Sequence, residues 1–305
     1  MALTLTEAAK LSNDVLVKGV IETIVKESPV LQKLSFIEVV GNALTYNREN
    51  AMATAAFYDV GDTWAESTPT FTQVTASLKI LGGDADVDNY VRSTRQNIQD
   101  IEAAVIELKA KALRHKFEDT LIYGNSAVNS KSWDGIRKLI DTTQAGPQVV
   151  TMGGTGATLT LANLDQLIDV IKPGKPDILL MSRRSRRKLT ALMRALGSIE
   201  VTKNEFGEFV ELYNGIPIAI NDWILDTHTL AAGYETDTTG ASNSVIYALK
   251  FGEGQLLGIQ GPGGLTVERL GSLETKDATR TRIKWYCGLA LFSTLAAGAL
   301  IGVQD

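Results

Sequence analysis

The sequence contains very few of the residues that build disulfides and metal sites. Cys287 is the only cysteine among 305 residues, and His115 and His228 are the only histidines. A single cysteine excludes an internal disulfide framework, and we expect Cys287 to be a small buried apolar residue in a reducing compartment. Neither histidine has a second ligand near it in the sequence, which argues against a histidine-rich metal site. No cofactor is expected.

The chain also lacks an excess of positive charge and a clear membrane signal. Its formal net charge is -5, which argues against tight sequence-independent binding to nucleic acid but leaves open a weak contact made many times over. Glu7 and Lys10 interrupt the N-terminus before an apolar run of signal-peptide length. The one long apolar stretch, Trp285 to Val303, is broken by glycine, serine and threonine. Its halves, Ile283 to Phe292 and Leu295 to Val303, suit two buried strands better than a membrane span.

The most regular segment runs from Ser93 to Gly124 and is predicted to be one long helix. Ser93 and Gln96 have the spacing of a capping box, and Gly124 stands where a left-handed C-terminal cap belongs. At 1.5 Å per residue the helix would be roughly 40 Å long, so we expect a strut. Two apolar stripes with alternating spacings of three and four predict two packed neighbours. The stripes are Ile98, Ile101, Val105, Leu108 and Ala112, and Ile106, Ala110, Leu113, Phe117 and Leu121.

Two segments before this helix have too little core of their own to fold on a single chain. Thr6 to Ser28 reads as a helical arm with Pro29 beyond its end. Strand-like segments, Leu34 to Arg48 and Val74 to Ile80, flank a small, polar stretch that carries large aromatic residues, which predicts a long two-stranded loop. An isolated hairpin with exposed aromatics is marginal in water, so we expect it to lie on another subunit. The candidate inter-subunit contacts are Phe57, Tyr58, Trp64, Phe71, Leu11 and Val15.

The second half of the chain predicts a compact mixed α/β module from Thr158 to Ile224. Thr160 opens one helix, and Ser182 caps another that ends at Gly197. Asn214-Gly215 is a tight-turn pair between strands. The expected buried strand is Asp177 to Met181, and the expected core positions of the two helices are Leu164, Leu167, Ile168, Ile171, Leu189, Leu192, Met193 and Leu196. Strands at Val245 to Phe251 and Leu256 to Ile259 follow, and then the C-terminal pair of strands.

Three motifs fall short of a functional site. Asp84, Asp86 and Asp88 resemble the start of a calcium loop, but Asn89 and Arg95 stand where glycine and glutamate are needed. The glycine-rich run at 153–156 lacks the ending of a phosphate-binding loop, and no nucleophile elbow occurs. The basic run at 183–188 lies opposite the apolar face of its helix, which indicates a solvated or interfacial face. No enzymatic activity is expected.

In their order and spacing, these segments resemble the major capsid protein family of tailed bacteriophages, which has the Hong Kong 97-type capsid fold. The strings that carry the resemblance are FEDTLIYG at 117–124, WDGI at 133–136, ILLMS at 178–182 and NGIPI at 214–218. The resemblance implies an α+β fold in five parts. These are an N-arm (1–33), an extended E-loop with flanking strands (34–81), a P-domain with a spine helix (82–157), an A-domain (158–243) and C-terminal strands that return through the A- and P-domains (244–305).

The function implied by the resemblance is a shell subunit. Copies of the chain would form pentamers and hexamers of an icosahedral phage head around double-stranded DNA, as a virion component assembled in the host cytoplasm. The implied partners are further copies of the chain, a separate scaffolding protein and a portal, with weak non-specific contact to packaged DNA; a decoration protein stays open, and no membrane is involved. An encapsulin-type compartment for cargo protein is the alternative, and an enzyme built on the α/β module is a second one.

The sequence departs from this family in two places. The arm begins almost at Met1, where some members carry a long cleaved scaffolding segment, so we expect a separate scaffolding protein or none. No lysine lies between Lys33 and Lys79, where some members have the lysine of an isopeptide cross-link. We therefore expect shells held together without covalent links.

Overall fold

The computed structural model describes residues 29–51, 53–95, 101–144, 147–197, 200–203, 209–231, 234–237 and 242–304. The predicted N-terminal arm, with its candidate contacts Leu11 and Val15, lies outside these residues. The first described element is the helix α3, Pro29–Lys33. Pro29, which the sequence places beyond the end of a preceding helix, is itself the first residue of α3, where its fixed φ suits the first helical turn.

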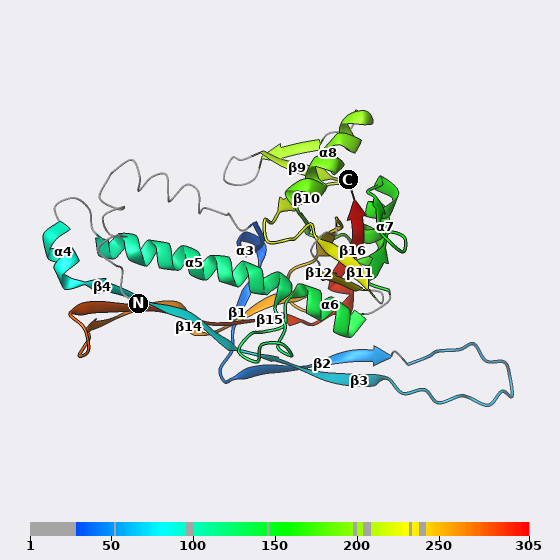
Figure 1. The fold of residues 1–305 in the computed structure, drawn as a ribbon. Coiled ribbons are helices and arrows are strands. Elements are labelled where there is room, and N and C mark those ends of the chain that lie inside the picture. The colour runs from blue at the N-terminus through cyan, green and yellow to red at the C-terminus, as the bar shows by residue number, and fades with distance from the viewer. Residues whose placement is uncertain are drawn as a thin grey trace.

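A four-stranded sheet and the long helix α5 form the elongated half of the molecule (Figure 1). The strand order is β1-β14-β15-β4; β1 runs parallel to β14, and the other neighbours are antiparallel. Helix α5, Ile101–Tyr123, packs against β4 and β15. The other elements of this half are β1 (Phe36–Glu38), β4 (Lys79–Asp88), α4 (Asn89–Arg95), β14 (Leu256–Ser272) and β15 (Ala278–Leu291).

Both ends of α5 differ from the sequence prediction. Ser93 lies inside α4, where its hydroxyl donates to the carbonyl oxygen of Tyr90 at 3.0 Å. The predicted capping box is therefore wrong, because Asp88 caps α4 instead and accepts a hydrogen bond from the Tyr90 N–H at 2.8 Å. Gly124 directly follows α5, but its φ is not positive. The predicted left-handed cap is also wrong, since another constraint selects glycine there.

Only one of the two predicted stripes of α5 belongs to the main core. Leu113, Phe117 and Leu121 are buried, whereas Val105 and Leu108 are half-buried and Ala112 is exposed. Val105 packs against a small separate cluster formed by Val87 and Val91. The second neighbour expected from the sequence is thus only this small cluster beside α4 and β4. Gln96 and Ile98, and the side chains of Ile101 and Ile106, lie outside the described part of α5.

The compact half is built on an eight-stranded sheet with the order β5-β16-β13-β7-β10-β9-β8, and β6 pairs with β16. Helix α7 packs against β16 and β5, α8 packs against β10, and α6 lies between α5 and β16. The helices are α6 (Ile136–Gln144), α7 (Leu161–Val170) and α8 (Arg183–Ala195), with a short 3-10 turn η1 (Thr294–Ala296). The strands are β5 (Val149–Thr151), β6 (Ala157–Thr158), β7 (Ile178–Met181), β8 (Glu200–Lys203), β9 (Phe209–Tyr213), β10 (Ile216–Ile220), β13 (Ser244–Leu249) and β16 (Ala297–Gln304). A separate pair is β11 (His228–Ala231) with β12 (Tyr234–Asp237).

The local signals of this half are confirmed. Thr160 and Ser182 cap α7 and α8, each accepting a hydrogen bond from the backbone N–H three residues on. Asn214 and Gly215 both have positive φ and join β9 to β10. Gly197, with φ +69°, follows the end of α8 as expected. Leu196 is wrong as a core residue, because it is 68% exposed at the end of that helix.

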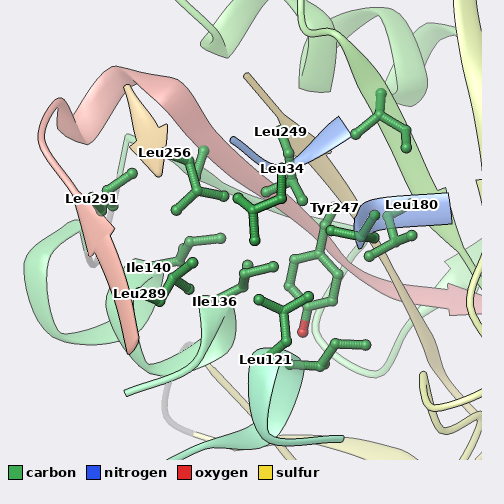
Figure 2. Packing of buried hydrophobic residues seen from close by; sticks show 14 of the residues in the cluster. Leu34, Leu121, Ile136, Ile140, Leu180, Tyr247, Leu249, Leu256, Leu289 and Leu291 are labelled. Atoms are coloured by element: carbon green, nitrogen blue, oxygen red, sulfur yellow. The ribbon is translucent and has the colours of Figure 1, made fainter. Parts of the chain in front are cut away.

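The two halves share one core, to which both C-terminal strands contribute. The predicted buried strands are present, but they do not pair with each other: β15 lies in the four-stranded sheet and β16 in the eight-stranded one. Figure 2 shows the side chains that meet between the halves: Leu34, Leu121, Ile136, Ile140, Leu180, Tyr247, Leu249, Leu256, Leu289 and Leu291. Across the described ranges, no helix combines the length and the hydropathy needed to cross a membrane.

Candidate subunit interface

A long β-hairpin projects from the body of the molecule (Figure 1). Its strands, β2 (Ala43–Ala51) and β3 (Thr70–Ser77), are antiparallel and pair only with each other among the described strands. The two-stranded loop predicted from the sequence is therefore confirmed. We use "the hairpin" for β2, β3 and their connection, and "the hairpin tip" for residues 53–69.

The base of the hairpin packs on the four-stranded sheet through one apolar face. Leu44, Tyr46 and Ala76 lie on this face, in agreement with the alternation of apolar and polar residues along both strands. They contact a small cluster that includes Ile259 of β14 and Ala290 of β15. The base is thus attached to the subunit by burial of apolar surface.

Two polar side chains of β2 continue this attachment beyond the apolar face. The Tyr46 hydroxyl donates to the carbonyl oxygen of Leu291 at 2.8 Å, and its ring lies 4.4 Å from the ring of Phe292. The Arg48 guanidinium donates through Nε to the carbonyl oxygen of Phe292 at 3.1 Å and through Nη2 to that of Leu291. Burial of the phenol raises the pKa of Tyr46, against the lowering effect of nearby Arg48.

The hairpin tip is held together by its own contacts. The rings of Tyr58 and Trp64 stack at 4.4 Å, and the Tyr58 hydroxyl accepts a hydrogen bond from the Ala65 N–H at 3.1 Å. At the turn, the Asp59 N–H donates to the Asp62 carboxylate at 2.7 Å. Within the part of the chain that the structure describes, the hydrogen bonds and ring contacts of residues 54–67 all lie inside the tip.

The tip exposes large apolar side chains to solvent. Phe57 and Val60 are fully exposed, and Trp64 is 77% exposed despite its stacking on Tyr58. Val60 was not singled out from the sequence, although an apolar residue inside the turn Asp59 to Asp62 is unusual enough to signal it. The tip carries three carboxylates and no lysine or arginine. Exposed aromatics of this kind mark interaction sites.

The predicted contact residues fall into three groups. Tyr58 and Trp64 lie together in the tip, with Phe57 next to them in the chain. Phe71 lies on β3, below the tip, and is 66% exposed. Leu11 and Val15 lie outside the described residues. The structure thus brings Tyr58 and Trp64 together, whereas Phe57 and Phe71 are exposed without a described ring contact to either.

The other charged motifs are engaged within the chain itself. Arg183 pairs with Asp222 through two hydrogen bonds, the longer of 3.0 Å, and Arg186 pairs with Glu211 at 3.4 Å. Asp84 and Asp86 of the rejected calcium motif pair across the sheet with Arg282 and Arg280, whose guanidinium groups hold the pKa of each carboxyl below its usual range. No group of three metal-ligating side chains occurs in the described ranges.

Cys287 and His228 also have structural positions. Cys287 is fully buried, and burial raises the pKa of its thiol. His228 is fully buried as well, with Nε2 3.0 Å from the hydroxyl of Tyr123, the last residue of α5. That hydroxyl accepts a hydrogen bond from the Leu225 N–H at 2.9 Å. These contacts connect the end of α5 to the compact half and point to packing rather than chemistry.

Comparison with known proteins gives a family match over nearly the whole chain. Residues 9–302 match the sequence model of a family described as SU10 major capsid protein. No curated protein matches the chain. Among solved structures, the chain is similar to the encapsulin of the holo-SrpI complex from Synechococcus elongatus, with a TM-score of 0.69 at 18% identity over 100% of this chain and 97% of that one.

Two capsid structures are similar in the same way. The capsid protein of cyanophage A-1(L) gives a TM-score of 0.68 at 13% identity over 92% of this chain and 94% of that one. The capsid of a native GTA particle gives 0.64 at 16% identity over 92% of each chain. At these identities the likeness shows the fold alone, and it confirms the expected Hong Kong 97-type fold.

Proposed function

Since this chain belongs to the SU10 major capsid protein family, we propose that its copies form the pentamers and hexamers of a closed icosahedral shell, with the hairpin tip of each copy lying on a neighbour. Family membership makes the chain a structural subunit of a phage head and a component of the virion, without enzymatic activity. The proposal concerns how the subunits join.

One observation carries the proposal. The hairpin projects from the body, and its tip leaves Phe57 and Val60 fully exposed and Trp64 largely exposed. Large aromatic residues commonly dominate interface energy, and losing such an anchor costs on the order of 2–4 kcal/mol per contact. In a closed shell this contact is repeated by every subunit, so its loss would be decisive.

The five-part division expected from the sequence belongs to the same proposal. The hairpin with β1 corresponds to the E-loop part, β4 with α5 to the P-domain, and α7, α8 and β7 to the A-domain. β15 pairs with β4, and β16 pairs with β13 near β7, which supports C-terminal strands that return through both domains. The preceding arm, with Leu11 and Val15, would add a further contact between subunits.

The partners that we propose are those expected of a phage head that contains DNA. We expect a scaffolding protein, a portal and weak non-specific contact with packaged double-stranded DNA, because the net charge of -5 does not favour tight binding to phosphates. An encapsulin-type cargo compartment is the second candidate, favoured by the similarity to the Synechococcus elongatus encapsulin over the full length of this chain. A protein cargo that copurifies with the particles would favour that candidate.

Electron microscopy of a hairpin variant tests the proposal. Replacing residues 59–69 by a short Gly-Ser turn should leave circular dichroism and thermal melting unchanged and abolish closed particles. Trp64→Ala is the single-residue version. Val128→Ala is a matched control, because Val128 is also exposed but lies on a loop after α5. Normal particles from the shortened variant would overturn the proposed contact, and lowered melting would mean that the tip folds on its own subunit.

A further inference from the structure

At the end of β15, one edge of the strand is not paired with another described strand of its sheet. β4 pairs with β15 only as far as Cys287, so residues 288–291 have no described partner strand on that edge. The Phe292 N–H donates to the Gln255 carbonyl oxygen at 2.9 Å, toward the β14 side. Because successive residues of an antiparallel strand direct their backbone groups to opposite edges, the carbonyl of Leu291 points to the open edge.

Side chains of the hairpin occupy this open edge. Tyr46 and Arg48 are two residues apart on β2 and therefore lie on the same face. Tyr46 and Arg48 both donate to the carbonyl oxygen of Leu291, and Arg48 also donates to that of Phe292. A guanidinium group holds two acceptors in a fixed planar geometry, which a single-point cation does not. These three hydrogen bonds, together with the Tyr46–Phe292 ring contact, form what we name the latch.

The latch is the outermost described attachment of the hairpin to its own subunit. Beyond it, Thr70, Phe71 and Thr72 are exposed, as is almost all of the tip. Val60 at the turn is twelve residues from Arg48, and an extended chain of that length reaches up to about 40 Å. By the same geometry, a rotation of about 10° at the latch displaces the turn by about 7 Å. A small change in the direction of the hairpin at its base therefore changes the position of the tip by several Å.

We propose that Tyr46 and Arg48 are positioning residues that fix the direction in which the hairpin leaves the subunit, and thereby the angle between neighbouring subunits in the shell. The second half of this statement rests on the proposed function. Leu44 and Ala76 pack in the apolar base without taking part in the latch hydrogen bonds, so we expect the base to stay packed when those bonds are removed. Latch variants therefore keep a folded and attached hairpin that is free to tilt.

Distance measurement between two spin labels tests the direction of the hairpin. Introduced cysteines can be labelled selectively, because Cys287 is fully buried. One label replaces Val60 at the turn and the other replaces exposed Ala112 on α5, and labelled chains are diluted with unlabelled ones so that only distances within a subunit are read. Arg48→Ala and Tyr46→Phe should broaden the distance distribution by several Å. Thr45→Ala, on the opposite face of β2, should leave it narrow.

Particle size tests the consequence for the shell. Arg48→Ala should yield particles of mixed diameter or none, whereas Arg194→Ala, which removes an exposed arginine of α8, should keep the uniform diameter of the unmodified protein. If the distance distribution between the labels is the same in Arg48→Ala and in the unmodified protein, the latch does not fix the direction of the hairpin. If Arg48→Ala forms uniform particles of unchanged diameter, the latch does not set the angle between neighbouring subunits. If the unmodified protein forms no particles, the proposed function fails, and the label distances still decide the latch.

Discussion

The backbone of Gly124 lies directly against the backbone of Trp133. A Cβ atom added to Gly124 would lie 2.4 Å from the carbonyl oxygen of Trp133 and equally close to that of Thr120. The Gly135 N–H also donates to the Gly124 carbonyl oxygen at 2.9 Å. This contact lies between the end of α5 and the start of α6. The segments 117–124 and 133–136 therefore pack directly against each other. There is no space for a side chain at position 124.

Gly124→Ala should destabilise the subunit by about 1–3 kcal/mol, because both clashing atoms belong to the backbone and cannot rotate away. Urea unfolding of unassembled subunits measures this change in the free energy of unfolding. Gly154→Ala is the matched control, since nothing lies within 4 Å of an added Cβ and its φ is not positive. An equal effect of the two substitutions would contradict the close contact.

The sequence identified Gly124 but not the reason for it. Helix N-caps and two-residue turns depend on the local sequence, which is why Thr160, Ser182 and Asn214-Gly215 were predicted correctly. The clash of Gly124 involves a residue nine positions away in a turn, and no periodic pattern encodes that contact. Helix α6 was missed although it carries a local signal, since Ile136 and Ile140 are one helical turn apart and both are buried.

Leu121→Ala should lower the free energy of unfolding by about 2–5 kcal/mol, since this side chain is fully buried in the core shared by both halves. Val105→Ala should cost clearly less, because Val105 is half-buried beside a two-residue cluster. Thermal melting and urea unfolding of both variants compare the two stripes of α5. If Val105→Ala had the larger effect, the assignment of the core stripe would be wrong.

Asp86→Asn should destabilise the subunit near neutral pH and not in strong acid. Hydrogen bonding to Arg280 holds the pKa of Asp86 below its usual range. The pair therefore stabilises the folded chain above the unfolded pKa of about 3.9, and this stability is lost as the pH falls through the lower folded pKa. Unfolding at about pH 7 and about pH 2 should show a difference that disappears in acid.

The control for this pH dependence is Asp169→Asn, which changes an exposed aspartate of α7. It should have little effect at either pH. A difference between Asp86→Asn and the unmodified protein that persisted at the lowest pH would mean that the shape of the residue matters, and not its charge.

The fold was more predictable than the attachment of its parts. Alternating residues predicted the hairpin, and apolar runs predicted the two C-terminal strands. Their placement in different sheets depends on tertiary pairing, which a single sequence does not display. The contact of Tyr46 with Leu291 spans 245 residues, so no spacing rule would have found it. The exposure of Phe57 and Trp64 was predictable because the segment around them is mostly small and polar.

Mature shells should dissolve into single subunits in hot denaturing detergent. The hairpin tip has no lysine, and the nearest one after it, Lys79, lies at the start of β4, where its Nζ donates to the carbonyl oxygen of Ser130 at 2.8 Å. An amide cross-link to a neighbour at the tip would need an amine there. Boiled particles should therefore give one gel band at the subunit mass of 32.9 kDa. A ladder of heavier bands would contradict this, and mass spectrometry of tryptic peptides would then identify the linked lysine.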